Sequence, residues 1–327
     1  MPIQATAVRI HQYGAPEVLQ FEDISVADPV GNEVRIRNKV IGLNFVDVYY
    51  RRGSMPVPEF PAILGNEGAG VIEAVGPNVT SVKVGDRVVY GHPSYGAYAS
   101  VRICDADHVV VIPDGISDEQ AASSFLKGLT SRYLVKEIVA LTPGDTVLYH
   151  AAAGGVGLMF AQWAKSIGVR LIGTVSDSKK AEAAKAAGFD EIINYRTEDF
   201  LARTLALTNG EGVKAVFDSV GKDTLEGSLA TLKNRGTLAQ FGIASGESRP
   251  IHLLELAPRS LMVTWPSLPS FIGARAELLA AAKDLFNAIQ TGVLDVTPTR
   301  VYSFEEVITA HHDLESRRTV GSAVLRV

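Results

Sequence analysis

The stretch HAAAGGVGLMFAQWAK, residues 150–165, decides the fold of this 327-residue chain. It follows DTVLYH, residues 145–150, a mostly apolar run of the length expected for a buried strand. Beyond the glycines, apolar side chains recur at helical spacing, and these are Val156, Phe160, Trp163 and Ile167. The stretch therefore predicts a strand, a glycine-rich turn and a helix in direct succession.

The turn matches most of the G-x-G-x-x-G pattern of dinucleotide-binding turns, because it reads Ala152-Ala153-Gly154-Gly155-Val156-Gly157 and lacks only the first glycine. Gly154 would let the backbone approach a pyrophosphate, and Gly157 would let the helix pack close to the strand. The N–H groups of the first helical turn would hold the anion. We expect a bound dinucleotide here, and the alternative is a turn that serves packing alone.

The alternation of strands and helices continues well beyond this turn. Compact apolar runs predict six strands, at residues 145–150, 169–175, 191–194, 213–219, 236–242 and 260–265. Helical patterns fill most of the gaps, near residues 156–167, 178–187, 197–207 and 224–233. Strands joined by helical crossovers predict a doubly wound, parallel six-stranded Rossmann sheet, which we assign to residues 116–294.

The remainder of the chain has a different pattern of secondary structure. Short strands separated by glycine and proline turns fill residues 1–115, as in EVRIRNKV at 33–40, where apolar residues alternate with charged ones. A further helix is expected at 275–290. The tail, residues 295–327, ends in an alternating strand that resembles the strands of residues 1–115. We therefore expect residues 1–115 and 295–327 to form a second, mostly β domain.

Composition excludes several classes of protein. The net charge is −5, from 31 basic and 36 acidic residues, so nucleic acid is an unfavourable partner. The longest apolar stretch, residues 151–161, is too short and too rich in glycine to span a membrane. The N-terminal residues lack the pattern of a signal peptide. The single cysteine, Cys104, suits a reducing compartment, and we expect a cytoplasmic protein.

The segment GTVSDSKK, residues 173–180, bears on which nicotinamide cofactor is bound. NAD sites normally place an acidic residue at the end of the second strand, where this chain has Val175 and Ser176. Lys179 and Lys180 follow, so a 2′-phosphate would meet cations rather than a carboxylate. We therefore predict NADPH, with the alternative that Asp177 takes the acidic role and the lysines are solvated.

The chain resembles the zinc-independent members of the medium-chain dehydrogenase/reductase superfamily, the NADPH quinone oxidoreductases related to zeta-crystallin. The resemblance runs nearly end to end and implies a GroES-like fold for the β domain. The stretches that carry it are YGAPEVLQ at 13, NFVDVYYRRG at 44, GNEGAGVIEAVG at 65, GDRVVY at 85, GAYAS at 96, SFLKGLTS at 124, HAAAGGVG at 150, INYR at 193, FDSVG at 217 and LESRRTVGS at 314.

The resemblance also explains the lack of zinc ligands. Zinc-dependent relatives carry a histidine in G-H-E, whereas this chain reads Gly65-Asn66-Glu67. Zinc needs three or four nitrogen or sulfur ligands. The chain has one cysteine, and its histidines, at positions 11, 92, 108, 150, 252, 311 and 312, show no ligand spacing. We expect no metal, and therefore an acceptor that is already activated, such as a quinone or a conjugated enone.

Site residues follow from the resemblance. Asn44 and Tyr49 are expected at the nicotinamide end as catalytic residues, with Asn44 also touching the cofactor. The other expected cofactor contacts are Thr130, Ala153, Gly154, Gly155, Val156, Gly157, Lys180, Tyr195, Phe241, Gly242, Arg317 and the segment 263–268, and position adds Ser176. Simpler roles stay open for four of these residues. Asn44 could cap a helix, Tyr49 and Tyr195 could pack in the core, and Arg317 could end a solvated helix.

These observations predict an NADPH-dependent reductase that holds a quinone between its two domains. Asn44 and Tyr49 would position the acceptor carbonyl or relay a proton through water. One alternative is an NADPH-dependent 2-alkenal or enone reductase on the same scaffold. Another is an NADPH-binding structural or RNA-associated protein with little turnover. The apolar stretch at 260–264 is expected to pair between subunits, which would give a homodimer.

Overall fold

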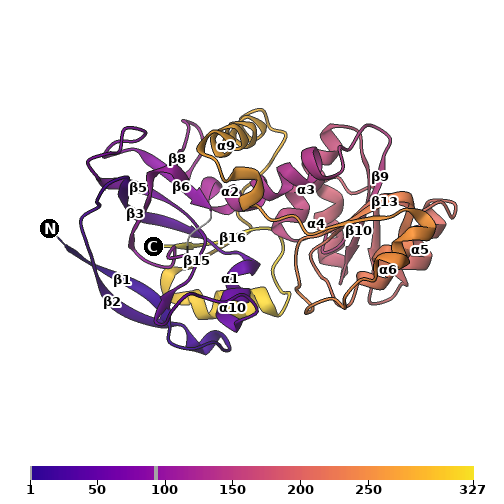
Figure 1. Ribbon diagram of the computed structural model, residues 1–327, viewed down its shortest axis with the longest axis horizontal. Helices are drawn as coiled ribbons and strands as arrows, with labels where there is room; N and C mark the ends of the chain where they lie inside the picture. The colour runs from indigo at the N-terminus through magenta and orange to yellow at the C-terminus, as the bar shows by residue number, and fades with distance from the viewer. Residues whose placement is uncertain (1, 92–94) are drawn as a thin grey trace. The chain divides into compact units, whose positions relative to one another are not determined.

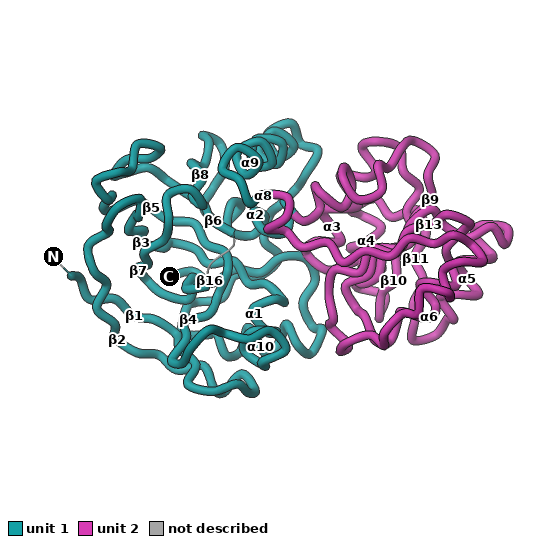
Figure 2. Tube along the Cα trace, in the orientation of Figure 1, with its two compact units in different colours: residues 1–129, 272–327 teal, residues 130–271 magenta. Residues whose placement is uncertain are grey.

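A computed structural model describes residues 2–91 and 95–327, so His92 lies outside the described residues. The chain forms two compact units (Figure 2). Unit 1 comprises residues 1–129 and 272–327, and unit 2 comprises residues 130–271. Unit 1 contains two sheets and unit 2 contains one, and each unit has its own hydrophobic core.

Unit 2 contains the predicted parallel sheet, with all six strands confirmed (Figure 1). The strands are β9 (Thr146–Tyr149), β10 (Arg170–Val175), β11 (Glu191–Asn194), β12 (Val213–Asp218), β13 (Leu232–Gln240) and β14 (Met262–Thr264). Their order across the sheet is β11-β10-β9-β12-β13-β14, and every pair is parallel. The order reverses between β9 and β12, which is where doubly wound sheets bind their ligands.

The four predicted crossover helices are also present. They are α3 (Gly155–Ser166), α4 (Ser178–Ala186), α5 (Phe200–Leu207) and α6 (Leu225–Thr231). Two of them begin at an aspartate cap: Asp177 accepts a hydrogen bond from the N–H of Lys180, and Asp199 accepts from Leu201 and Ala202. Such caps satisfy N–H groups that have no partner within the helix. Short helices α7 (Leu253–Leu256) and α8 (Pro269–Ile272) follow β13 and β14.

Unit 1 is mostly β, as expected. A seven-stranded sheet has the order β15-β16-β3-β5-β6-β8, with β7 also paired to β3, and a three-stranded sheet has the order β2-β1-β4. The strands are β1 (Ile3–Ile10), β2 (Gln20–Val26), β3 (Glu33–Gly42), β4 (Ala62–Ile63), β5 (Glu67–Val75), β6 (Arg87–Gly91), β7 (Val101–Asp105), β8 (Val110–Val111), β15 (Arg300–Ser303) and β16 (Ala323–Arg326). Because β16 pairs with β3, the tail does belong with the first part of the chain.

Four longer helices complete unit 1, except that α2 runs past its boundary. They are α1 (Phe45–Arg52), α2 (Asp118–Tyr133), α9 (Arg275–Gln290) and α10 (Val307–Glu315). Single 3-10 turns lie at Pro16–Val18, Ala106–His108 and Phe304–Glu306 in this unit and at Ala257–Arg259 in unit 2, where a π-helical turn spans Leu134–Ile138. Helix α1 begins after Asn44 and ends at Gly53, whose φ of 79° suits a glycine.

The boundaries of the units differ from the expected ones at 115 and 295. Residues 116–129 and 272–294 belong to unit 1 rather than to the Rossmann unit. The physical reason is that α2 and α9 pack together: the rings of Phe125 and Phe286 stack with centres 6.0 Å apart. A Cβ on Gly128 would lie 2.4 Å from Cδ1 of Leu285, so glycine lets the two helices approach without moving that side chain.

Candidate functional site

The glycine-rich turn of unit 2 leaves the carboxyl end of β9, beside the point where the strand order reverses. Ala151 adopts a φ of +57°, and the N–H of Gly154 donates to its carbonyl oxygen at 2.9 Å. Gly154 then caps α3, whose first-turn N–H groups on Gly155, Val156 and Gly157 have no acceptor within the helix. This arrangement fits the diphosphate of a dinucleotide, because such N–H groups bind anions.

The two glycines predicted to matter have different surroundings. A Cβ on Gly157 would lie 2.6 Å from the carbonyl oxygen of Ala152 and 2.9 Å from that of Ala151, so only glycine fits. A Cβ on Gly154 would lie 3.2 Å from the oxygen of Ala151, so that carbonyl would have to move by a few tenths of an ångström. The geometry supports a packing role for Gly157. Gly154 is partly exposed, as a residue that faces a ligand must be, whereas Ala153 is buried.

The residues predicted to choose between NADPH and NADH lie together after β10. Nζ of Lys180 is 2.9 Å from Oγ of Ser176. The carboxylate of Asp177 accepts a hydrogen bond from Oγ of Ser176 at 2.8 Å and another from the N–H of Lys180 at 3.0 Å. The bond from the N–H of Lys180 is the main reason that the pKa of Asp177 is lowered. Asp177 therefore acts as a helix cap, which weakens the alternative that it recognises a ribose.

The remaining predicted cofactor residues of unit 2 lie at other strand ends. Tyr195 follows β11, and its N–H donates to the oxygen of Val175; the residue is 38% exposed, so it does not belong to the core. Phe241 follows β13, with its N–H bonded to the oxygen of Asp218. A Cβ on Gly242 would lie 2.7 Å from the oxygen of Ser219. These positions are the carboxyl ends of parallel strands, where a ligand is expected.

For two predicted residues and one predicted segment, the position in the structure says little about a contact with the cofactor. Thr130 is buried in the part of α2 that belongs to unit 2, and its side chain is hydrogen-bonded to that of Tyr133. Residues 263–268 form the end of β14 and the loop beyond it. Arg317 belongs to unit 1, directly after α10, and is exposed with a φ of +58°. Its position fits a solvated helix end, so its role toward a phosphate stays a prediction.

Sequence reasoning missed a buried polar chain behind the turn. Nδ1 of His150 lies 3.0 Å from Oγ1 of Thr174, and Nε2 lies 3.0 Å from Oγ of Ser228. Oγ of Ser228 in turn donates to Asp218 at 2.9 Å. Burial lowers the pKa of His150, so the ring is neutral. The chain joins the residue after β9 to β10, α6 and β12, and no spacing in the sequence indicates it.

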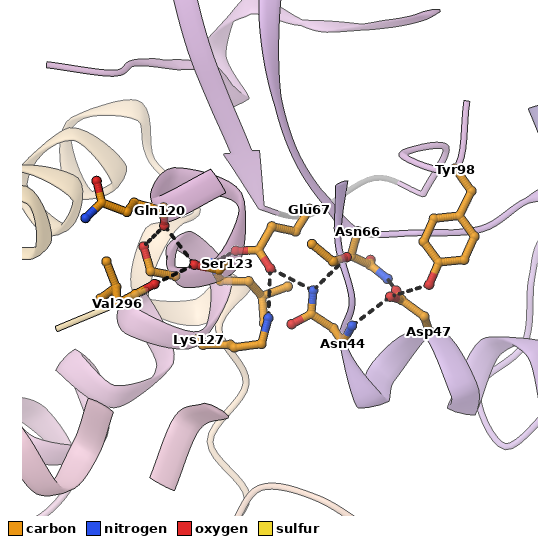
Figure 3. A network of polar contacts seen from close by, with 12 residues as sticks. Asn44, Asp47, Asn66, Glu67, Tyr98, Gln120, Ser123, Lys127 and Val296 are labelled. Carbon is orange, nitrogen blue, oxygen red and sulfur yellow. Dashed lines mark hydrogen bonds and ion pairs between the residues drawn. The ribbon is translucent and has the colours of Figure 1, made fainter. Parts of the chain in front are cut away.

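In unit 1, Asn44 donates hydrogen bonds to Asp47, to Glu67 and, more weakly at 3.4 Å, to the carbonyl oxygen of Gly42 (Figure 3). It occupies the position before α1, and its N–H donates to Oδ2 of Asp47 at 3.0 Å, which supports the helix-capping alternative in part. Its side-chain Nδ2 donates to Oε2 of Glu67 at 2.8 Å. Asn44 is 4% exposed, so its amide is almost completely buried. The hydrogen bond to Glu67 fixes the orientation of that amide.

Asp47 is a buried carboxylate with three donors. It accepts from the N–H of Asn44, from Nδ2 of Asn66 at 2.7 Å and from the hydroxyl of Tyr98 at 3.0 Å. Burial raises its pKa to about 6, and the hydrogen bonds limit that rise. Asn66 stands where zinc-dependent relatives have a histidine, so here a neutral amide faces the carboxylate. Asp47 was not among the predicted site residues.

Glu67 is a second buried carboxylate with three donors (Figure 3). Oε1 accepts from the N–H of Leu126 at 2.7 Å, and Oε2 accepts from Nδ2 of Asn44 and, at 3.2 Å, from Nζ of Lys127. Neither Glu67 nor Lys127 was predicted as a site residue. The available signal was a lysine in the apolar run SFLKGLTS.

Tyr49 lies on α1 and is 8% exposed. Its ring meets that of Phe45 edge to face, with the ring centres 5.3 Å apart. The packing alternative for Tyr49 therefore has structural support, and a catalytic role remains a prediction.

The described residues show neither a metal-binding cluster nor a membrane-spanning helix. Within residues 2–91 and 95–327, no group of three or more His, Cys, Asp or Glu side chains is arranged to hold a metal ion. Across those same residues, none of the helices combines the length and the apolar character needed to cross a bilayer.

Comparison with known proteins gives two family matches. Residues 31–114 match the alcohol dehydrogenase GroES-like domain, and residues 155–286 match the zinc-binding dehydrogenase domain. A quinone oxidoreductase of Salmonella typhimurium is 47% identical over 98% of this chain and 99% of its own length. A 2-haloacrylate reductase of Burkholderia sp. is 41% identical over 98% of both chains.

A solved structure extends this likeness to three dimensions. The crystal structure of Escherichia coli quinone oxidoreductase complexed with NADPH matches with a TM-score of 0.96 and 46% identity. The match covers 98% of this chain and all of the solved chain.

Proposed function

This chain belongs to the zeta-crystallin-like quinone oxidoreductases of the medium-chain dehydrogenase/reductase superfamily, and we propose that it transfers reducing equivalents from NADPH to quinones without a metal ion. One observation carries the proposal. The Gly154–Gly157 turn leaves the central strand of the Rossmann sheet with its first-turn N–H groups available to an anion. The relative solved with NADPH supports the choice of nucleotide.

The residues of unit 2 would hold NADPH by its charges and its rings. The first turn of α3 binds the diphosphate, with Gly154 allowing the close approach. Ser176 and Lys180 bind the 2′-phosphate, with Tyr195 beside them, while Phe241 and Gly242 line the path of the cofactor. Arg317 is proposed as a further cation for the phosphate. When bound, NADPH supplies the reducing equivalents for the reaction.

Unit 1 would orient the acceptor. Asn44, held by Glu67 and by its position before α1, has a fixed amide that can bind the acceptor carbonyl. Tyr49 lies on the same helix and would bind the carbonyl or carry a proton through water. Holding a reactant in place contributes a large part of the rate when a cofactor carries the chemistry.

The decisive experiment is an acceptor screen with the purified protein. We expect NADPH fluorescence to shift on binding, and NADPH to be oxidised faster with quinones than with 2-alkenals or enones. The relative that is a 2-haloacrylate reductase makes the reduction of an activated C=C bond the second candidate, so the panel includes such compounds. Binding without turnover would instead support a structural or RNA-associated protein. Failure to bind NADPH, or stoichiometric zinc in the purified protein, would contradict the proposal.

Assembly and location are also proposed. β14 is the last strand of its sheet, and apolar side chains on or beside it are exposed, with Met262 at 54% and Trp265 at 50%. Such an edge favours pairing with a second copy of the chain, so we propose a homodimer. The net charge of −5 disfavours nucleic acid as a partner. A single, buried cysteine suits the cytoplasm.

A further inference from the structure

The hydrogen bonds of the His150 ring in unit 2 have a determined direction. Oγ of Ser228 donates its only proton to Oδ2 of Asp218 at 2.9 Å, so the same oxygen must accept from Nε2 of His150. The proton of the neutral ring is then on Nε2, and Nδ1 accepts from the hydroxyl of Thr174 at 3.0 Å. His150 therefore accepts from Thr174 on one side and donates to Ser228 on the other.

The Asp218 end of this buried chain is firmly anchored. The carboxylate accepts four hydrogen bonds, and the donors are the hydroxyls of Thr224 and Ser228 and the N–H groups of Val220 and Gly221. Asp218 and Ser228 are both 0% exposed. Buried polar networks with every partner in place make the structure around them rigid. The anchored carboxylate therefore fixes the orientation of Ser228 and, through it, that of the His150 ring.

Thr174 connects this ring to the end of β10. The N–H of Ala152 donates to the carbonyl oxygen of Thr174 at 3.1 Å, while the hydroxyl of Thr174 donates to the ring. Ser176 comes two residues later and forms, with Lys180, the proposed site for the 2′-phosphate. His150 directly precedes the turn that is proposed to bind the diphosphate. The ring thus bridges the beginnings of the two segments that would hold the phosphates of one cofactor.

We propose that His150 is a positioning residue for the recognition of NADPH, an inference that rests on the proposed function. Its ring fixes the end of β10 relative to the glycine turn. A nucleotide whose diphosphate lies at the turn then meets Ser176 and Lys180 with its 2′-phosphate. NADH lacks that phosphate, so its binding does not depend on this alignment. His150 is 1% exposed and acts through Thr174, without a contact to the cofactor.

The variant that tests this alignment is Thr174→Val, which removes the hydroxyl and keeps a branched side chain of similar size. We expect the ratio of the Kd for NADH to the Kd for NADPH to fall by roughly three- to tenfold, the value of one hydrogen bond, with the Kd for NADH nearly unchanged. Thr174→Ser keeps the hydroxyl and should retain the wild-type ratio. Fluorescence titration measures both Kd values, and urea unfolding without nucleotide measures stability.

Thr204→Val is the matched control. Thr204 is a fully buried threonine of the same unit, and its hydroxyl has no hydrogen-bond partner among the residues that the structure describes. The control should leave the ratio of the two Kd values as in the wild type, because its hydroxyl belongs to no chain that reaches β10.

The ratio separates positioning from stability. A wild-type ratio in Thr174→Val would overturn the inference, and so would an equal loss of affinity for both nucleotides, which is the effect of a merely structural contact. Should Thr174→Val fail to fold, His150→Gln tests the same bond, since its amide can donate to Ser228 but offers no acceptor at the position of Nδ1. It should lower the ratio as well, and a wild-type ratio there would overturn the inference. A wild-type protein that binds neither nucleotide would instead defeat the proposed function, and this inference with it.

Discussion

The hydroxyl oxygen of Tyr98 lies 2.9 Å from Nε2 of His311, so a hydrogen bond joins two side chains that are 213 residues apart. The other ring nitrogen, Nδ1, lies 3.2 Å from Nη1 of Arg51. Arginine can only donate, so Nδ1 must accept and the proton of the neutral ring must be on Nε2. His311 therefore donates to Tyr98, and Tyr98 donates to Asp47. The direction of every bond in this buried chain is determined.

His311 should make the fold sensitive to acid. Burial, with the charge of Arg51, lowers its pKa from the usual 6.5 to about 3. An unfolded chain would bind a proton near pH 6.5 that the folded chain refuses until about pH 3, so the contribution of His311 to stability is lost as pH falls through this window. Asp47, with a pKa raised to about 6, acts in the opposite direction between its usual 3.8 and 6.

Asp47 is present in both the wild type and His311→Gln, so a comparison of the two proteins reduces its share of the difference in stability. The stability advantage of the wild type over this variant should shrink by about 1.4 kcal/mol per pH unit below pH 6.5. Urea unfolding at several pH values measures it. A difference that stays constant with pH would contradict the assignment of a neutral His311.

Local patterns in the sequence predict the Rossmann sheet well. Each of its strands is a short apolar run between turn residues, and the helices begin at recognisable caps such as Asp177. The glycine turn is equally local, since the strand, turn and helix are contiguous. The tail strand β16 was placed correctly because its alternation matched that of the first domain.

Long-range contacts are what the sequence could not reveal. The stacking of Phe125 on Phe286 packs α9 against α2, so α9 belongs to unit 1. In the sequence, its helical pattern follows those of the Rossmann helices and looks like one more of them. Buried polar residues such as Asp47 and His311 find their partners only in the folded chain, and their spacing carries no signal. The family stretch that contains Lys127 was visible, but its pairing with Glu67 was not.

The two glycines of the turn should fail in different ways when changed to alanine. Gly157→Ala forces a methyl group against backbone oxygens and should lower the free energy of unfolding by roughly 1–3 kcal/mol, as overpacking does. Gly154→Ala requires only a shift of a few tenths of an ångström at the Ala151 carbonyl, so the fold should persist while the affinity for NADPH drops. Urea unfolding without nucleotide and fluorescence titration with NADPH separate the two effects. Normal NADPH affinity in Gly154→Ala would remove this residue from the proposed phosphate site.

Lys180 should determine the preference for NADPH over NADH. Its Nζ is held against Ser176, and Lys180→Glu would place a carboxylate where the 2′-phosphate is proposed to bind. Losing a hydrogen bond to a charged group costs about 1.5–3 kcal/mol, so the ratio of kcat/KM for the two nucleotides should fall by about tenfold or more. Lys185→Glu, in the last turn of the same helix, makes the same change of charge and should leave the ratio close to that of the wild type. Equal ratios in both variants would exclude Lys180 from this role.

Tyr49 can be tested without disturbing the packing of α1. Tyr49→Phe keeps the edge-to-face contact with Phe45 and removes only the hydroxyl. If that hydroxyl binds the acceptor, kcat/KM for quinones should fall by up to about tenfold, the value of one hydrogen bond, with NADPH binding unchanged. Tyr50→Phe removes a hydroxyl from the next residue, which faces Tyr95, and serves as the control. If Tyr49→Phe is as active as the control, Tyr49 is a packing residue.

The sheet edge at β14 should determine the oligomeric state. Val263 lies at the centre of this strand and is 36% exposed, and a charged side chain on an open edge opposes pairing. Val263→Lys should therefore shift the protein from dimer to monomer in sedimentation velocity at micromolar concentration. Leu253→Lys places the same charge on a more exposed apolar residue of the same unit and should leave the dimer intact. A wild-type monomer, or a dimer that survives Val263→Lys but not Leu253→Lys, would move the interface away from this edge.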